Sequence, residues 1–116
     1  MRPVPSPYLV NGKLNKTAKQ GEALFVQAGC HLCHNGEYLT DGKKYDVGTG
    51  IEEYTGVPFD TPTLREVWRT APYLYNGSAV TIKDVLTTLN KNDQHGVTSN
   101  MTEQEIEALE QYILSL

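Results

Sequence analysis

Two cysteines and a histidine, Cys30, Cys33 and His34, are the side chains with the clearest chemical use in this sequence. Their pattern, Cys-x-x-Cys-His, is typical of covalent haem attachment. Two thiols at this spacing can each add to one vinyl group of a single haem, and a histidine directly after the second thiol then lies under the iron as an axial ligand. Because these are the only two cysteines among 116 residues, we predict one covalently bound haem c.

Three other uses of the two cysteines have less support. Zinc would suit Cys30, Cys33 and one or both of His31 and His34, but zinc sites usually need a second ligand pair, and only His95 remains elsewhere. A redox dithiol is expected within a βαβ pattern, and no such pattern is visible here. A structural disulfide across two intervening residues would be strained. Haem attachment is therefore the favoured interpretation.

The length and charge of the chain limit the class of protein. With 116 residues, the chain fits one small domain. Its formal net charge of −4 argues against a surface for nucleic acid or anionic membranes, because both require basic patches. No apolar run approaches the length of a membrane span. We therefore expect neither nucleic acid binding nor a membrane span.

The N-terminal segment, residues 1–14, is linker-like and has three prolines among its first seven residues. It lacks the apolar stretch of a signal peptide. Haem is joined to Cys-x-x-Cys-His outside the bacterial cytoplasm, so we expect a periplasmic or cell-surface protein. The chain is then a mature form or an excised piece of a larger exported redox protein.

The element that must place the two thiols is a helix, predicted to start near Asn15 or Thr17 and to run to about Ala28, with its apolar face at 23–26 and its end at Gly29. After the motif, residues 35–60 are rich in Gly, Tyr, Thr and Asp and show no sustained apolar period. This composition predicts a long loop with room for a short hairpin. Long loops in compact domains are normally functional or packed against something, and we expect this one to cover a face or edge of the haem.

Three further helices are expected in the second half of the chain. Their ranges, with the residues that each should bury, are 62–69 (Leu64, Val67 and Trp68), 81–90 (Ile82, Val85, Leu86 and Leu89) and 102–116 (Ile106, Leu109, Ile113 and Leu116). The last two begin with capping-box patterns, at Thr81 and Thr102. A first helix before the haem motif and a last helix that crosses it are the arrangement of a small class I cytochrome c. We therefore predict an all-α, cytochrome c-like domain over residues 15–116, with three to four main helices and long loops around one covalent haem.

The second iron ligand decides the chemistry. A six-coordinate haem passes electrons, whereas an open or weakly held sixth site binds peroxide, oxygen or other small ligands. His95 and Met101 both lie in the segment before the last helix, from which small cytochromes often draw this ligand. A loop histidine is otherwise a solvated or capping side chain, and Met101 is otherwise a core residue. The alternatives are His95, which is favoured, Met101, a tyrosine, and an open site.

Further residues are candidates for contact with the haem itself. The guanidinium groups of Arg65 and Arg69 suit haem propionates, although a solvated helix face explains them equally well. Trp68 is placed to lie near the haem edge, but a tryptophan is more often simply a core residue. Pro72 and Tyr73 are expected to pack close to the ring.

Three segments carry a family resemblance: residues 59–65 (Phe-Asp-Thr-Pro-Thr-Leu-Arg), 70–78 (Thr-Ala-Pro-Tyr-Leu-Tyr-Asn-Gly-Ser) and 81–86 (Thr-Ile-Lys-Asp-Val-Leu). As a set they resemble the C-terminal haem domain of the bacterial dihaem cytochrome c peroxidase and MauG superfamily. The match extends over most of the chain, from 21–25 to 112–116. The resemblance implies a cytochrome c fold, a periplasmic or cell-surface location, and His34 as the proximal ligand.

The departures from that family favour electron transfer over catalysis. The family usually has two haem domains, whereas this chain has one Cys-x-x-Cys-His. Leu89, which cannot bind iron, stands near the position where the peroxidases offer a methionine and MauG-type enzymes a tyrosine. Tyr75-Asn76 stands where the family often has His-Asp. The sixth iron ligand would then have to come from further along the sequence, from His95 or Met101.

These observations together predict a monohaem c-type cytochrome domain that transfers electrons. Its partner is a separate redox protein or a second haem domain of the parent chain. One rival is a peroxidase-type enzyme domain with an open sixth site, for which Gln94 or His95 would be the distal acid–base residue. The other rival is a haem sensor that binds small ligands.

Overall fold

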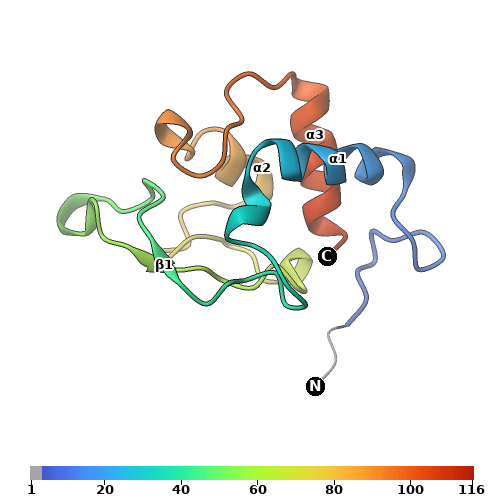
Figure 1. Cartoon of the computed structure of the whole chain (residues 1–116), viewed down its shortest axis with the longest axis horizontal. Helices are drawn as coiled ribbons and strands as arrows, with labels where there is room; N and C mark the ends of the chain where they lie inside the picture. Colours follow the sequence, from blue (N-terminus) through green and yellow to red (C-terminus); the bar gives the residue numbers. More distant parts are fainter. Residues whose placement is uncertain (1–3) are drawn as a thin grey trace.

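The computed structural model describes residues 4–116 and contains three α-helices joined by long irregular segments (Figure 1). The helices are α1 (Lys16–Gln27), α2 (Ile82–Leu86) and α3 (Glu103–Leu114). The connecting segments hold four short 3-10 turns, η1 (Cys30–Leu32), η2 (Glu52–Tyr54), η3 (Val67–Arg69) and η4 (Lys91–Asp93), and two antiparallel strands, β1 (Lys44–Tyr45) and β2 (Phe59–Asp60). The prediction of a mostly helical domain is confirmed. The fold is not strictly all-α, however, because it contains the two short strands β1 and β2.

Helices α1 and α3 cross in direct contact, and this crossing is the centre of the fold (Figure 1). Gly21 of α1 lies at the contact. A Cβ atom on Gly21 would stand 1.9 Å from the carbonyl oxygen of Ala108 and 2.7 Å from Cβ of Tyr112. Further along α1, the ring of Phe25 packs edge-to-face on Tyr112, with centroids 5.2 Å apart. The two backbones approach so closely because Gly21 has no side chain.

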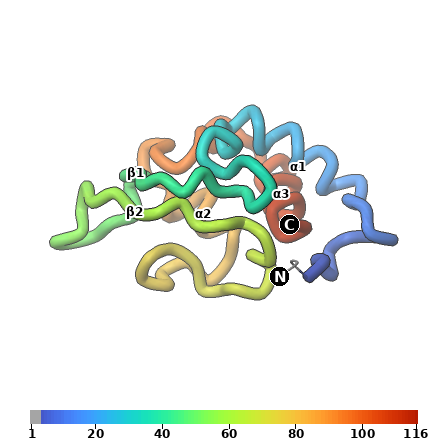
Figure 2. Tube along the Cα trace, turned by 60° about the horizontal axis from the view of Figure 1, so that its bottom comes forward, coloured from blue at the N-terminus to red at the C-terminus, as the bar shows by residue number. Residues whose placement is uncertain are grey.

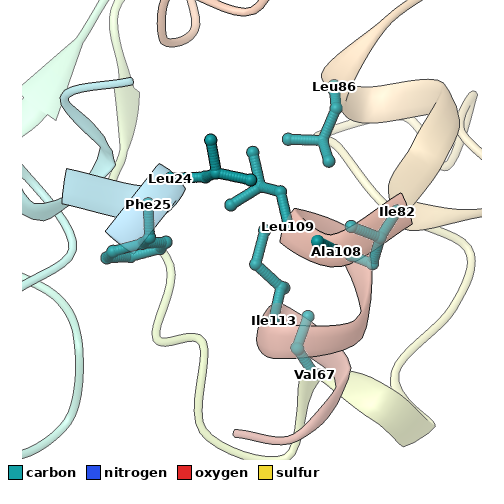
Figure 3. Packing of buried hydrophobic residues seen from close by; sticks show 8 residues of the cluster. All are labelled: Leu24, Phe25, Val67, Ile82, Leu86, Ala108, Leu109 and Ile113. Atoms are coloured by element: carbon teal, nitrogen blue, oxygen red, sulfur yellow. The ribbon is translucent and has the colours of Figure 1, made fainter. Parts of the chain in front are cut away.

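One hydrophobic cluster joins the three helices to the turn η3 (Figure 3). Its members are Leu24 and Phe25 from α1, Ile82 and Leu86 from α2, Ala108, Leu109 and Ile113 from α3, and Val67 from η3. Leu109 lies between the other helices' side chains and has no exposed surface (Figure 3). This cluster holds α1 in place and therefore fixes the position of the haem motif that follows it.

The polar residues that start the helices act as predicted. The side chain of Asn15 accepts a hydrogen bond from the backbone N–H of Ala18 at 2.8 Å. Thr102 and Glu105 form a reciprocal capping box at the start of α3, and Thr81 forms one at the start of α2. Each box satisfies backbone N–H groups that have no partner within the helix.

Helices α1 and α2 lie where predicted but differ in detail. The buried stripe of α1 is not 23–26, because Ala23 and Val26 are exposed. Its buried residues follow the helical spacing instead: Ala18, Gly21, Leu24 and Phe25. Helix α2 ends at Leu86 rather than near residue 90, since Thr87 leaves the helical conformation with φ −122° and ψ −86°.

The helix predicted over 62–69 is wrong, and the chain forms only the turn η3 in this range. Glu66 has a left-handed backbone with φ +63°, which a continuous helix cannot accommodate. As a result Val67 is buried, whereas Leu64 and Trp68 are only partly buried.

Residues 35–60 form a loop-rich arm that extends away from the α1–α3 crossing (green in Figures 1 and 2). The two strands of the arm place Tyr45 opposite Phe59. The ring of Phe59 in turn stacks on Tyr75, with centroids 4.4 Å apart. This contact ties the arm to the segment that follows η3.

The N-terminal segment contacts the end of α3 through Ser6, and Val4, Pro5 and Leu9 line a cavity with Ser115 and Leu116; residues 1–3 of the predicted linker lie outside the described residues. The hydroxyl of Ser6 donates to the carbonyl of Leu114 at 2.5 Å, and the backbone N–H of Val4 donates to the Glu66 carboxylate at 2.6 Å. Across residues 4–116, no helix is long and apolar enough to cross a membrane.

Candidate haem site

The two thiols lie on one turn at the end of α1. Gly29 ends the helix with a left-handed backbone (φ +87°), and the turn η1 follows at once from Cys30. Both thiols are free and partly buried, so the pair is not a disulfide. Burial raises the pKa of Cys30 to about 11, which keeps this thiol protonated at neutral pH.

His34 is held in the tautomer that an iron ligand needs. Its Nδ1 lies 3.1 Å from the carbonyl oxygen of Leu39. Because a carbonyl can only accept, Nδ1 carries the proton and Nε2 keeps its lone pair for a metal. Burial lowers the pKa of His34, which also favours the neutral ligand form. Leu39 has a left-handed backbone, φ +56°, that no local sequence signal indicates.

His95 lies in a loop that packs against the cysteine turn. The next residue, Gly96, lies close to Cys30 and to the end of α1. A Cβ atom on Gly96 would stand 3.6 Å from Sγ of Cys30 and 3.4 Å from the carbonyl oxygen of Ala28. Burial, and secondarily the charge of His34, lowers the pKa of His95 to about 4. Nδ1 of His95 is buried and has no hydrogen-bond partner among the described residues.

Met101, the other candidate for the sixth position, has the surroundings of a core residue. Its side chain packs against the hydrophobic cluster and lines a cavity of about 430 Å³ between α2 and α3. Leu86 and Ile106 line the same cavity.

Three other residues predicted to contact the haem have different surroundings in the structure. Nε of Arg65 donates to the carbonyl of Glu37 at 3.0 Å. The Arg65 side chain also lines a cavity of about 280 Å³ beside the N-terminal segment. Tyr73 packs on the core and its hydroxyl donates to the carbonyl of Val67 at 2.9 Å. Pro72 is exposed.

Trp68 and its neighbour Arg69 lie together on the turn η3. The guanidinium of Arg69 stands 5.4 Å from the indole ring centre and forms an ion pair with Glu66 at 2.5 Å. Nε1 of Trp68 is buried and has no hydrogen-bond partner among the described residues. A buried N–H without an acceptor costs free energy, which an acceptor from a bound group would offset.

The residues present fit a haem. Two free thiols on one turn, an imidazole whose Nδ1 donates to a backbone carbonyl, and a second imidazole with a buried, unpartnered Nδ1 are donors that suit a covalently bound haem. A zinc site would need a different arrangement, with at least three ligands converging. Over residues 4–116, no three His, Cys, Asp or Glu side chains form such a group.

Several residues near the motif were not found from the sequence. The hydroxyl of Tyr45 donates to the Asp41 carboxylate at 2.5 Å, and Tyr45 lies close enough to Cys33 for this thiol to affect its pKa. Asn90 and Asp93 hydrogen-bond within the loop that carries His95. For Asn90 and Asp93, the sequence offered only the general preference of Asn and Asp for tight loops.

The Tyr45–Asp41 pair predicts a defined pH dependence of stability. The hydrogen bond from Tyr45 holds the pKa of Asp41 below its usual 3.8 and, chiefly for the same reason, the pKa of Tyr45 is raised from 10.0 to about 12. The bond therefore stabilises the fold above the ordinary pKa of Asp41 and is lost as the pH falls through the lowered one. At high pH it is lost as the pH rises from 10 to about 12.

Replacement of Tyr45 with phenylalanine removes this bond. We expect the haem-loaded variant to unfold at lower urea concentration than the native protein near pH 7, and the two midpoints to converge as the pH falls through the lowered pKa of Asp41. The exposed Tyr54→Phe is the matched control and should leave the midpoint unchanged at every pH. A difference for Tyr45→Phe that is constant from pH 7 down to acid unfolding would contradict the assignment.

Comparison with known proteins relates this site to haem proteins. A family model described as RoxA-like, cytochrome c-like matches residues 58–94. Hydrazine synthase subunit gamma of Kuenenia stuttgartiensis is 33% identical over an alignment that covers 81% of this chain and 33% of that protein. A solved structure of hydrazine synthase from the same organism superposes with a TM-score of 0.88 at 27% identity, covering 100% of this chain and 51% of that chain.

Two further relatives are named for peroxidase or MauG activity. Cytochrome c peroxidase IdrP1 of Pseudomonas sp. strain SCT is 30% identical, with 72% of this chain and 34% of that protein covered. Methylamine utilization protein MauG of Methylorubrum extorquens is 31% identical, with 60% of this chain and 24% of that protein covered. The chain thus spans about a quarter to a third of the length of these three curated relatives. These matches confirm the resemblance found in the sequence: the chain is a cytochrome c-like haem domain and belongs to the cytochrome c peroxidase and MauG superfamily.

Proposed function

We propose that this domain binds one haem covalently through Cys30 and Cys33, with His34 and His95 as the two iron ligands, and transfers single electrons. The observation that carries the proposal is the environment of His95. The residue is half-buried, its Nδ1 is buried and unpaired, and it lies on a loop whose Gly96 packs against the sulfur of Cys30. An unpaired imidazole nitrogen costs free energy when buried, and coordination to iron would offset that cost.

Each residue of the site has a separate task in this proposal. The bound haem supplies a one-electron iron couple, and its potential depends on the axial ligands and on burial. His34 keeps its proton on Nδ1 through the Leu39 carbonyl, which orients the ring and makes Nε2 a better donor. His95 stays neutral down to about pH 4 because it is buried, so it remains a competent ligand across the physiological range.

The rival function is that of a peroxidase domain with an exchangeable sixth site, and the names of relatives such as cytochrome c peroxidase IdrP1 favour it. Under that function His95 would act on a substrate and leave the iron open. Our proposal assigns the electron partner to another part of a longer protein or to a separate redox protein. It also assigns the domain to an exported compartment, because haem c is attached outside the bacterial cytoplasm.

The test compares two single variants of the haem-loaded protein. We expect His95→Ala to convert a low-spin absorption and electron paramagnetic resonance spectrum into a high-spin one, because the sixth position opens. Met101→Leu keeps the volume of a core side chain and should leave the low-spin spectrum intact. The opposite pattern, with Met101→Leu high-spin and His95→Ala unchanged, would reject His95 as the ligand.

A further inference from the structure

We propose that Asn90 is a positioning residue for His95, and that it keeps this ligand on the iron in both oxidation states by locking the loop on which His95 lies. The proposal rests on the assignment of His95 as an iron ligand. In this arrangement Asn90 makes the ligation by His95 permanent rather than exchangeable. The locked segment is the loop of residues 90–99, between α2 and α3.

The side chain of Asn90 bridges the chain on both sides of His95. Its Oδ1 accepts from the backbone N–H of His95 at 2.9 Å. Its Nδ2 donates to the carbonyl of Gly96 at 2.9 Å and to the hydroxyl of Thr98 at 2.9 Å. A carboxamide is the side chain that supplies one acceptor and two donors together, so no other residue type of this size can make all three bonds.

A second set of bonds closes the far end of the loop. The carboxylate of Asp93 accepts from the backbone N–H of Thr98 at 3.2 Å and of Ser99 at 3.1 Å, and from the Ser99 hydroxyl at 2.6 Å. Asn92 and Asp93 both have left-handed backbones, with φ +54°. This conformation is one that Asn and Asp tolerate better than most residues. The loop therefore has a defined shape before any ligand is considered.

The loop is also anchored to the two elements that position the haem motif. The hydroxyl of Thr98 donates to the carbonyl of Leu86 in α2 at 2.6 Å, in a buried position. The backbone N–H of Val97 donates to the carbonyl of Ala28, at the end of α1, at 2.9 Å. Because Ala28 lies two residues before Cys30, this bond attaches the loop to the segment that carries the thiols.

These contacts make His95 a fixed ligand rather than a switching one. To leave the iron, the imidazole must either rotate about its own side-chain bonds, which takes its Nδ1 out of a buried position, or take the backbone of residues 90–99 with it. The second route breaks the bonds of Asn90 and the contact with α1 at the same time. Removing Asn90 should therefore raise the fraction of molecules in which the sixth position is open.

The experiment measures carbon monoxide binding to the reduced, haem-loaded protein, together with the low-spin fraction of the oxidised protein by electron paramagnetic resonance. We expect Asn90→Ala to bind carbon monoxide at least about tenfold more tightly than the native protein, because apparent affinity scales with the open fraction. It should also show a new high-spin signal. Asn90→Asp keeps the acceptor for the backbone N–H of His95 but loses both donors. Its carbon monoxide affinity and its high-spin signal should lie between those of the native protein and those of Asn90→Ala.

The matched control is Asn15→Ala, which removes an asparagine side chain that bonds to one backbone N–H at the start of α1, away from this loop. It should lower stability without changing carbon monoxide affinity or the low-spin fraction. If Asn90→Ala yields no folded protein, the same measurement on Asn90→Asp decides.

If Asn90→Ala and Asn90→Asp both have the carbon monoxide affinity and the spin state of the native protein, Asn90 does not position His95. The assignment of His95 as an iron ligand would not be affected by that result. An unchanged low-spin spectrum in His95→Ala would instead overturn the ligand assignment, and the role of Asn90 with it.

Discussion

Replacement of both Cys30 and Cys33 by alanine is expected to abolish covalent haem attachment. Both thiols are free and lie on a single turn, η1 and its end, so they can reach one macrocycle together. Their sulfur atoms are the only ones in the chain able to form thioether bonds. A haem stain of the denatured protein on a gel should be positive for the native chain and negative for the double variant.

The control for this pair is His31→Ala, which changes an exposed residue inside the same motif. It should keep both the stain and the spectrum, because its side chain is not needed for attachment. Covalent haem in the double alanine variant, or its loss in His31→Ala, would contradict the assignment of the two thiols.

Replacement of Gly21 by valine is expected to prevent the domain from folding. Even one added carbon would stand 1.9 Å from the carbonyl oxygen and 2.6 Å from the carbonyl carbon of Ala108, and backbone atoms of a packed helix cannot move aside easily. Overpacking a core typically costs about 1–3 kcal/mol and sometimes more. We expect the milder Gly21→Ala to lose at least about 3 kcal/mol of unfolding free energy by urea titration, despite alanine's better helix propensity.

Gln20→Ala is the neighbouring control, because Gln20 is exposed on the same helix. It should change the unfolding free energy by no more than about 0.5 kcal/mol. A Gly21→Ala protein as stable as the native one would show that α1 and α3 do not cross at this residue.

The features that the sequence predicted well are those encoded within a few neighbouring residues. The cap at Asn15 and the capping boxes at Thr81 and Thr102 each depend on side chains that act on their own turn. Such signals remain valid wherever the rest of the chain lies. For the same reason the boundaries of α1 and α3 were predicted closely.

The features that the sequence did not predict depend on contacts between distant residues or on unusual backbone angles. The turn at Glu66 replaces a predicted helix because this residue is left-handed, and its backbone N–H donates to the carbonyl of Leu116. The exposure of Val26 follows from where α3 crosses α1, which helical periodicity alone does not specify. Tertiary contacts override local propensity in such places.

The site was predicted unevenly for the same reasons. The sequence placed His95 and Met101 together as candidates, because both precede the last helix. Their surroundings differ, with Met101 against the core and Gly96, next to His95, against Cys30, and the choice of His95 as the ligand stays a prediction. The role of Asn90 could not be predicted, since an asparagine five residues before a histidine carries no recognisable pattern.

The most direct test of a closed, electron-transfer haem site is the electron paramagnetic resonance spectrum of the oxidised, haem-loaded protein before and after addition of hydrogen peroxide. Ligation by His34 and His95 predicts a low-spin signal that peroxide does not change, without a methionine-to-iron charge-transfer band in the absorption spectrum. A high-spin signal that shifts on addition of peroxide would contradict this account and favour a peroxidase domain with an open sixth site.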